Sequence, residues 1–340
     1  MTTIPIAHCF DHNYVLPAGV AFQSLLEHAQ APDTTYALHA VGSGLTNEDM
    51  DILSEVVARF PQATLTFHEP PKLPIPDSAI PRKAHFSKDL FYKFLVSDLL
   101  PDHDIALLAD VDVVYRRDIA NVYNALAPDE PFYLAGVQSP AYASWRNEGL
   151  YPNERRGSKK YFSLFSAEER DRMVLTAGLL VYNCSRIRAD GIVRKWIDCA
   201  TSNAHRLLLP EQDVFGLVCG RSGVKPLSWG LMADALASVR YGSMTPAERA
   251  ANPTWDEMYA SPLQIHYASP IKPWKFPDMP MAGLWFDACI RAGLFHRWRE
   301  WYGKFAQPME DWLRSKKLFS ASFRIRGREL TFSLTKRKVK

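Results

Sequence analysis

Hydrophobic and polar positions alternate between two spacings along the first seventy residues, and the alternation predicts strands and helices in turn. Short apolar runs bounded by turn residues predict buried strands at Ile4–Cys9, Tyr36–Val41 and Ala63–His68. Apolar positions at helical spacing predict helices over Val15–Ala29 and Asn47–Phe60. This order favours an α/β fold with a mostly parallel sheet that is flanked by helices.

The pattern continues further along the chain, with one long interruption. The apolar run Ile105–Ala109 is too short for a helix and predicts a central buried strand. Between two later strands the pattern breaks down, and the polar, aromatic segment Tyr142–Arg172 predicts an irregular insertion over the active site. Apolar spacing and proline content predict the remaining elements, namely a loop at Pro70–Pro81, helices at Lys88–Leu100, Ser185–Asn203 and Leu284–Lys317, and strands at Pro131–Val137 and Ala177–Asn183.

Two acids, Asp110 and Asp112, directly follow the central strand, with Val111 between them. In open α/β sheets, ligands bind beyond the carboxyl ends of the strands. Two carboxylates at that edge can hold a hard cation such as Mn²⁺ or Mg²⁺, which can bridge a diphosphate. The alternative is a solvated strand end that carries two acids.

The run from His266 to Trp274 places a histidine and a lysine, Lys272, six residues apart around an expected turn. Imidazole is a common metal ligand, and an ammonium group pairs with phosphate oxygens. Such a loop could close over a metal-diphosphate unit. The alternative is a structural histidine and a solvated lysine.

Two shorter polar clusters allow both a functional and a structural interpretation. In Asp11-His12-Asn13-Tyr14, the tyrosine can stack on a base while the aspartate accepts an imide N–H, or the aspartate simply caps a helix. In Glu211-Gln212-Asp213, the side chains can hold sugar hydroxyls and face an anomeric carbon. The alternative is an acidic helix N-terminus that the helix dipole stabilises.

These pieces, in this order, resemble glycosyltransferase family 8, the retaining transferases with a GT-A fold that include bacterial lipopolysaccharide glucosyl- and galactosyltransferases. The resemblance runs from about Ile4 to Trp274. Asp110-Val111-Asp112 matches the family's Asp-x-Asp, and His266 to Trp274 matches His-Tyr-x-Gly-x-x-Lys-Pro-Trp. Val20–Leu26 is similar to the helix in which the family has Ser-Leu-Leu.

Four positions depart from the family pattern, and all are expected near the donor. Lys93 replaces the arginine of Tyr-x-Arg, which keeps the charge and loses the bidentate fork. Thr176 replaces the asparagine of Asn-Ala-Gly-Val, and Glu211 replaces the first acid of Asp-Gln-Asp. Ser269 replaces the glycine of the run from His266 to Trp274, which we call the closing loop. The departures indicate either an altered sugar preference or a weakened enzyme.

The resemblance implies a GT-A type fold and a metal-dependent, retaining transfer of glucose or galactose from a UDP-sugar to a glycan acceptor such as lipopolysaccharide. It implies Asp110, Asp112 and His266 as ligands of Mn²⁺ or Mg²⁺, and Gln212 and Glu211 as the catalytic pair. It assigns the nucleotide and diphosphate to Ala7, Asp11, Asn13, Tyr14, Lys93, Asp110, Val111, Ser269 and Lys272, and the sugar to Thr176, Ala177, Glu211 and Gln212.

The last part of the chain differs in charge from the rest. Residues 314–340 contain ten basic residues and one acid, a net charge of +9, although the whole chain carries only +3. Several aromatic residues precede this segment. We therefore expect a catalytic domain at 1–283 and a helical, basic extension at 284–340 that docks on an anionic membrane face. The alternative is that the aromatic side chains pack on the catalytic domain.

The remaining sequence features limit the compartment and the function class. The five cysteines are scattered and form no Cys-x-x-Cys pair, and neither a signal peptide nor a spanning segment is expected, so a cytoplasmic protein is favoured. The first strand lacks the glycine-rich loop usual in a sugar nucleotidyltransferase. A non-catalytic nucleotide-sugar or carbohydrate-binding protein stays an alternative. No nucleic-acid recognition motif accompanies the basic tail.

Overall fold

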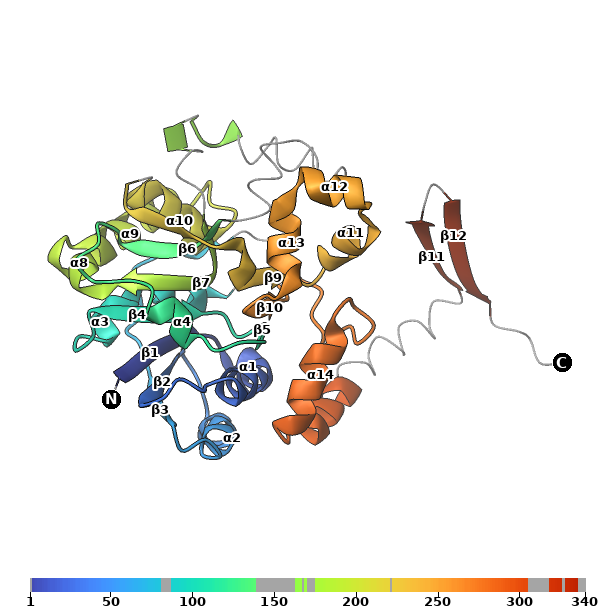
Figure 1. Ribbon diagram of the computed structural model, residues 1–340, viewed down its shortest axis with the longest axis horizontal. Coiled ribbons are helices and arrows are strands. Elements are labelled where there is room, and N and C mark those ends of the chain that lie inside the picture. The colour runs from blue at the N-terminus through green and yellow to red at the C-terminus, as the bar shows by residue number, and fades with distance from the viewer. Residues whose placement is uncertain are drawn as a thin grey trace.

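A seven-stranded sheet lies at the centre of the computed structural model, in the order β3-β2-β1-β4-β7-β6-β8 (Figure 1). The structure describes residues 2–80, 87–138, 163–166, 168–169, 175–220, 222–304, 318–325 and 328–335. The strands are β1 (Thr2–Cys9), β2 (Thr34–Val41), β3 (Ala63–His68), β4 (Ile105–Ala109), β6 (Leu134–Gln138), β7 (Leu175–Asn183) and β8 (Val224–Leu227).

The sheet is parallel across its first four strands and changes direction at β7. β3, β2, β1 and β4 run parallel, whereas β7 runs antiparallel to both β4 and β6, and β8 runs parallel to β6. Every residue of β4 is buried, as expected for a central strand. The α/β class and the mostly parallel sheet are confirmed.

Helices cover both faces of this sheet (Figure 1). On one face, the core contains side chains of α1 (Val15–Glu27), α2 (Asn47–Val57) and α14 (Ala282–Arg291). On the other face, it contains side chains of the 3₁₀ segment η3 (Lys88–Leu95) and of α3 (Val96–Leu99), α8 (Cys184–Ala189), α9 (Ile192–Ser202) and α10 (Pro210–Cys219). The shorter elements are η1 (His12–Tyr14), η2 (Asp77–Ala79), α4 (Ala120–Tyr123), η4 (Trp229–Leu231), α11 (Ser238–Ser243), α12 (Pro246–Ala251) and α13 (Pro253–Ala260).

A second, three-stranded sheet brings the closing loop to the end of β4. Its order is β5 (Val113–Tyr115), β10 (Gln264–His266) and β9 (Met232–Asp234), with β10 antiparallel to β5 and parallel to β9. Ser24 fixes this sheet on α1, because its buried hydroxyl accepts the Tyr115 N–H at 3.0 Å. This contact gives a structural reason for the serine in the Ser-Leu-Leu of α1.

Three predicted helices are wrong in detail. The predicted helix Leu284–Lys317 is interrupted after α14, where Gly293 has a φ of 71°, and helix resumes over residues 295–304. The segment Lys88–Leu100 is mostly a 3₁₀ helix, and only Val96–Leu99 is α-helical. The segment Ser185–Asn203 is two helices, because Gly191 has a φ of 61° in the left-handed region, which glycine adopts at little cost and which ends α8.

The aromatic segment after residue 283 packs on the main core. Trp285 is fully buried in α14, and Phe286, Phe295, Trp298 and Trp301 pack against the same cluster, the last three from the helical residues 295–304. The expected boundary at 283–284 therefore falls within α14. Residues 305–317 lie outside the described part, and β11 (Leu318–Ile325) and β12 (Arg328–Thr335) form an antiparallel pair that the sequence analysis does not anticipate. Among the described residues, no helix is both long and apolar enough to cross a bilayer.

Candidate active site

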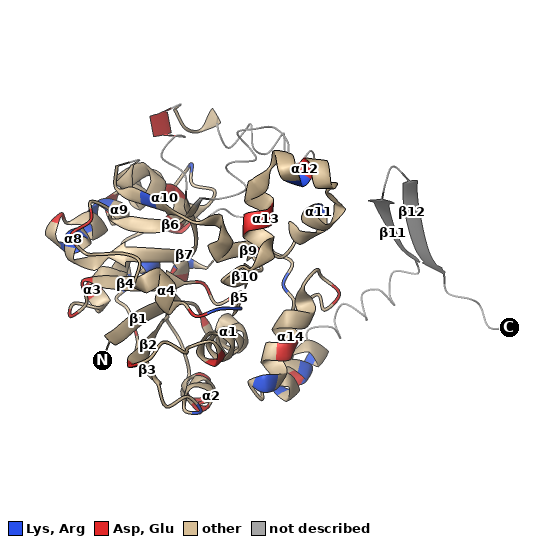
Figure 2. Ribbon diagram, viewed as in Figure 1, with Lys and Arg blue, Asp and Glu red and all other residues tan. Residues whose placement is uncertain are grey.

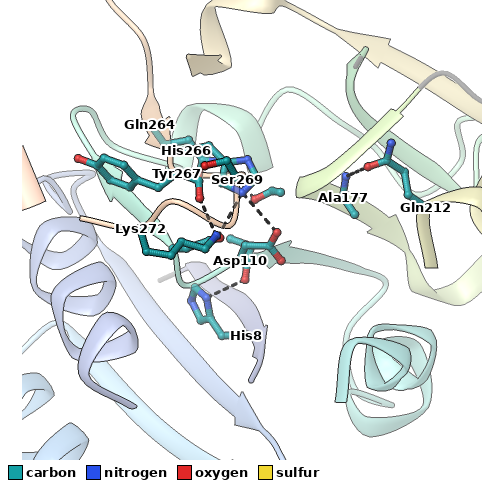
Figure 3. A network of polar contacts seen from close by, with 12 residues as sticks. His8, Asp110, Ala177, Gln212, Gln264, His266, Tyr267, Ser269 and Lys272 are labelled. Atoms are coloured by element: carbon teal, nitrogen blue, oxygen red, sulfur yellow. Dashed lines mark hydrogen bonds and ion pairs between the residues drawn. The ribbon is translucent and has the colours of Figure 1, made fainter. Parts of the chain in front are cut away.

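Asp110, Asp112 and His266 converge at the carboxyl end of β4. The His266 Nε2 atom lies 3.6 Å from Asp110 Oδ2 and 3.2 Å from Asp112 Oδ1 (Figure 3). One ligand atom from each residue fits within 4.8 Å of the others, and no further group of this kind occurs among the described residues. Two carboxylates and an imidazole at this spacing could hold a divalent metal ion.

Gly178 on β7 makes room for the His266 ring. A Cβ atom on Gly178 would lie 2.5 Å from His266 Cε1 and 2.6 Å from Nδ1, which is too close for any side chain. The Gly178 carbonyl also accepts the Asp110 N–H and the Gln264 side-chain amide, both at 3.2 Å. A glycine inside a strand often marks such a close approach, so the sequence held a usable indication of this residue.

Lys272 binds the other oxygen of Asp112 from the one that His266 faces. Its Nζ atom lies 2.5 Å from Asp112 Oδ2 and donates to the Tyr267 carbonyl at 2.6 Å. Although burial opposes ionisation, Lys272 and His266 hold the pKa of Asp112 well below its usual value. Burial likewise opposes protonation of His266, but Asp112 and Asp110 raise the pKa of this histidine. Lys272 and His266 therefore keep Asp112 negatively charged in the buried site.

Lys93 binds Asp110 in the way that Lys272 binds Asp112. Its Nζ atom lies 2.7 Å from Asp110 Oδ1 and 2.9 Å from Glu211 Oε1, and only 4% of the residue is exposed. Burial alone would lower the pKa of Lys93, but Asp110 and Glu211 raise it above its usual value. The two positions at which the family pattern has arginine and aspartate are therefore in direct contact here.

The residues expected around the sugar lie on β7 and at the start of α10. Gln212 Oε1 accepts the Ala177 N–H at 3.3 Å, which fixes the amide beside the strand (Figure 3). Thr176 is the partly exposed neighbour of Ala177. Asp213 has a structural part, because its buried carboxylate accepts the N–H groups of Leu208 and Leu209.

The nucleotide residues expected on β1 and η1 lie at the carboxyl end of the sheet. Ala7 is fully buried in β1. Asp11 caps η1 by accepting the Asn13 N–H at 2.9 Å, which is the capping role left open from the sequence. The Tyr14 ring makes an edge contact with Trp274, with centroids 5.7 Å apart, and thereby joins η1 to the closing loop.

The closing loop tolerates Ser269 in place of glycine. Ser269 has no positive φ, and its hydroxyl contacts the Ile271 N–H and carbonyl at 3.0 Å, so it stabilises its own turn. Val111 is buried between the two aspartates. The loop is fixed from behind by Trp298, which donates its indole N–H to the Trp274 carbonyl at 3.0 Å.

Two site residues were not singled out from the sequence. His8 is fully buried and its Nδ1 atom donates to the Ala109 carbonyl at 2.9 Å, directly before Asp110 (Figure 3). Tyr267 supplies the main-chain carbonyl that holds Lys272. A buried histidine and a main-chain contact leave little trace in sequence pattern. The insertion Tyr142–Arg172 lies outside the described residues except for 163–166 and 168–169.

The chain matches the family model for glycosyl transferase family 8 over residues 5–277. This match covers most of the sequence, so the chain belongs to glycosyl transferase family 8 and is a glycosyltransferase. No curated protein sequence matches the chain.

Several solved structures share this fold and are distant in sequence. The bifunctional glycosyltransferase WbbM superposes with a TM-score of 0.64 at 18% identity, over 84% of this chain and 49% of WbbM. The galactosyltransferase LgtC, solved with donor and acceptor sugar analogues, gives 0.62 at 18% identity, over 86% of this chain and 95% of LgtC. GlyE of Streptococcus pneumoniae TIGR4 gives 0.56 at 17% identity, over 88% and 64%. This chain thus spans about half of WbbM and nearly all of LgtC.

Proposed function

We propose that this glycosyltransferase moves glucose or galactose from a UDP-sugar to a glycan acceptor, with retention of configuration and dependence on Mn²⁺ or Mg²⁺. The observation that carries the proposal is the convergence of Asp110, Asp112 and His266 beside the buried Lys272. A bound cation would neutralise the diphosphate oxygens and stabilise the leaving UDP.

The residues of the closing loop would hold the leaving group. Lys272 already has a fixed position on the Tyr267 carbonyl, and an ammonium group has three N–H donors. One of these donors can therefore bind a phosphate oxygen while the main-chain contact is kept. In a buried site, such a charge stabilises a developing phosphate anion more strongly than it would in water.

The sugar would lie between β7 and the start of α10. Gln212, whose amide is fixed on Ala177, would face the anomeric carbon, and Thr176 and Glu211 would bind sugar hydroxyls. A carboxamide is a weak nucleophile, so we favour attack from the face of the leaving group over a covalent glycosyl-enzyme. Isolation of a glycosylated Gln212 or Glu211 from a trapped reaction would contradict this choice.

The nucleoside would bind at the end of β1. Ala7, Asp11, Asn13 and Tyr14 lie on β1 and η1, and Tyr14 contacts the closing loop through Trp274. A base placed there would be close to both the first strand and the loop. The solved complex of LgtC with donor and acceptor sugar analogues supports a sugar donor and a sugar acceptor.

The acceptor and the cellular location belong to the same proposal. A lipopolysaccharide or other glycolipid acceptor would be reached by a cytoplasmic enzyme whose basic tail, residues 314–340, attaches to the inner face of the membrane. Because the described aromatic side chains pack on the core, the attachment would rest on the basic charge. Truncation after Leu313 should abolish binding to anionic liposomes and spare donor hydrolysis, whereas unchanged liposome binding would remove the membrane claim.

The donor is tested with a panel of UDP-sugars and Mn²⁺, with free UDP, sugar and pyrophosphate measured separately. We expect release of UDP and sugar from UDP-glucose or UDP-galactose, and little from the others. Release of pyrophosphate in the presence of UTP and a sugar phosphate would indicate a nucleotidyltransferase. Binding of UDP-sugars without any turnover, in the presence of saccharide acceptors, would indicate a binding protein.

A further inference from the structure

Lys93 is buried between two carboxylates that come from different parts of the chain. Asp110 follows β4, and Glu211 lies in the first turn of α10, yet both accept from the same ammonium group, at 2.7 Å and 2.9 Å. Only 5% of the Lys93 side chain is exposed, so water screens these contacts little. The position of the positive charge therefore depends on both carboxylates at once.

The two oxygens of Asp110 face different groups. Oδ2 faces the His266 imidazole, on the side where a cation would bind, and Oδ1 binds Lys93. Because Lys93 binds Oδ1, it neutralises the carboxylate and leaves Oδ2 free to bind a cation. Such a charge lowers the affinity of Asp110 for a cation, and the effect grows as the ammonium moves closer.

Glu211 is the second carboxylate that accepts from this ammonium group, at 2.9 Å. It is not one of the three residues whose ligand atoms converge, and its contact is with Lys93. This carboxylate competes with Asp110 for the ammonium group, so it weakens the hold of Lys93 on Asp110. Its reach matters as well as its charge, since a side chain shorter by one methylene would leave Lys93 closer to Asp110.

We propose that Lys93 and Glu211 together set the affinity of the Asp110–Asp112–His266 group for its divalent cation, with Glu211 acting as a positioning residue through Lys93. This inference rests on the proposed metal site. It also gives the replacement of arginine by lysine and of aspartate by glutamate a common reason. One side chain becomes shorter and the other longer, so the contact is preserved.

The proposal is tested by titrating full-length protein with Mn²⁺ and following free Mn²⁺ by electron paramagnetic resonance. Lys93→Met removes the ammonium charge that competes with the cation for Asp110, so it should tighten Mn²⁺ binding about tenfold. We expect this gain even though the variant also loses the expected contact of Lys93 with the UDP-sugar. Glu211→Asp keeps the charge and shortens the reach, so it should weaken binding about fivefold. The same change made in the Lys93→Met background should alter binding less than twofold, because the residue through which Glu211 acts is gone.

Two further variants keep the test decisive. Lys93→Gln, which is neutral and polar, should also tighten binding, and it is measured in case the methionine variant does not fold. The double variant Lys93→Arg with Glu211→Asp should restore wild-type affinity within threefold. Lys88→Met is the matched control, because Lys88 lies on the same 3₁₀ segment and pairs with Asp77 at the surface.

The outcomes separate this inference from the proposed function. Equal effects of Glu211→Asp in the two backgrounds, or weaker Mn²⁺ binding by both neutral Lys93 variants, would overturn the inference and leave the metal site standing. A wild-type protein that binds neither Mn²⁺ nor Mg²⁺, alone or with UDP, would overturn the metal site and the inference with it.

Discussion

Asp110 and Asp112 each turn one oxygen to His266 and the other to a buried lysine, but the two lysines are held differently. Lys272 is anchored by the main-chain carbonyl of Tyr267, on its own loop. Lys93 is anchored by the side chain of Glu211, which is distant in the sequence. A main-chain anchor does not depend on side-chain identity, whereas a side-chain anchor changes with length and charge. The site therefore has two halves. The half formed by Asp112 and Lys272 is expected to be rigid, and the half formed by Asp110, Lys93 and Glu211 is expected to be adjustable.

The largest expected effect follows from removing the aspartate of the rigid half. Asp112→Asn should lower the rate of UDP release by about 10³-fold, because it removes a proposed cation ligand and the partner of Lys272. It should also destabilise the fold by about 3 kcal/mol, since a buried ammonium loses its counter-charge. Steady-state UDP release and chemical denaturation measure the two effects, and a rate within tenfold of wild type would contradict the assignment.

Replacing each of the two lysines, Lys272 and Lys93, by arginine tests whether the two halves of the site differ in rigidity. Lys272→Arg should lower the rate about 100-fold, because a planar guanidinium cannot replace an ammonium held between Asp112 and a fixed carbonyl. Lys93→Arg combined with Glu211→Asp should stay within tenfold of wild type, since the anchor changes with the lysine. Comparable losses in the two variants, measured by UDP release, would mean that the halves do not differ in rigidity.

A smaller effect is expected when His266 is displaced. Gly178→Ala should weaken Mn²⁺ binding about tenfold, because the new methyl group would overlap the imidazole. The control is Gly242→Ala, since a Cβ at Gly242 meets nothing within 4 Å. Both are measured by Mn²⁺ titration, and equal affinities in the two variants would show that the ring can move at no cost.

The last expected effect is on stability rather than on activity or metal binding. It concerns the main chain beneath the site, and it depends on pH. Burial lowers the pKa of His8 to about 4, so the unfolded chain, with a pKa near 6.5, binds the proton more readily. The stability contributed by the neutral histidine is complete above pH 6.5 and is lost as the pH falls toward 4. Between pH 7.5 and pH 5, His8 should account for about 2 kcal/mol of lost stability.

The His8 effect is isolated by comparison with His8→Gln, because His39 also has a pKa lowered by burial. Urea denaturation at pH 7.5 and pH 5 should show a smaller loss for the variant than for wild type. The same loss in both proteins would mean that His8 does not contribute.

Much of the fold could be predicted from the chain, but the contacts that decide the site could not. Strand and helix spacing was sufficient for β1 to β4 and for α1. β1, β2, β4 and α1 are mostly buried apolar runs, and β3 alternates exposed and half-buried positions. The break at Gly191 depends on one left-handed residue inside an otherwise helical pattern. The direction of β7 depends on pairing with β4 and β6, which no local pattern contains.

The site shows the same limit. Asp110, Asp112, His266 and Lys272 were singled out because short motifs carry them, and the family resemblance joined them. The contact between Lys93 and Glu211 links residues 118 positions apart, so the sequence presented two separate departures rather than one exchange. From the sequence, Gly178 could be interpreted only as a glycine within a strand. Its role depends on the ring of His266, which comes from β10.

The central claim, that a divalent cation held by Asp110, Asp112 and His266 is needed for glycosyl transfer, is tested most directly by metal depletion. UDP release from UDP-glucose and UDP-galactose is measured after chelation and during titration with Mn²⁺. The account predicts activity that disappears on chelation and returns with Mn²⁺ in the wild type, and no return in Asp112→Asn. Undiminished UDP release from fully chelated wild-type protein would contradict it.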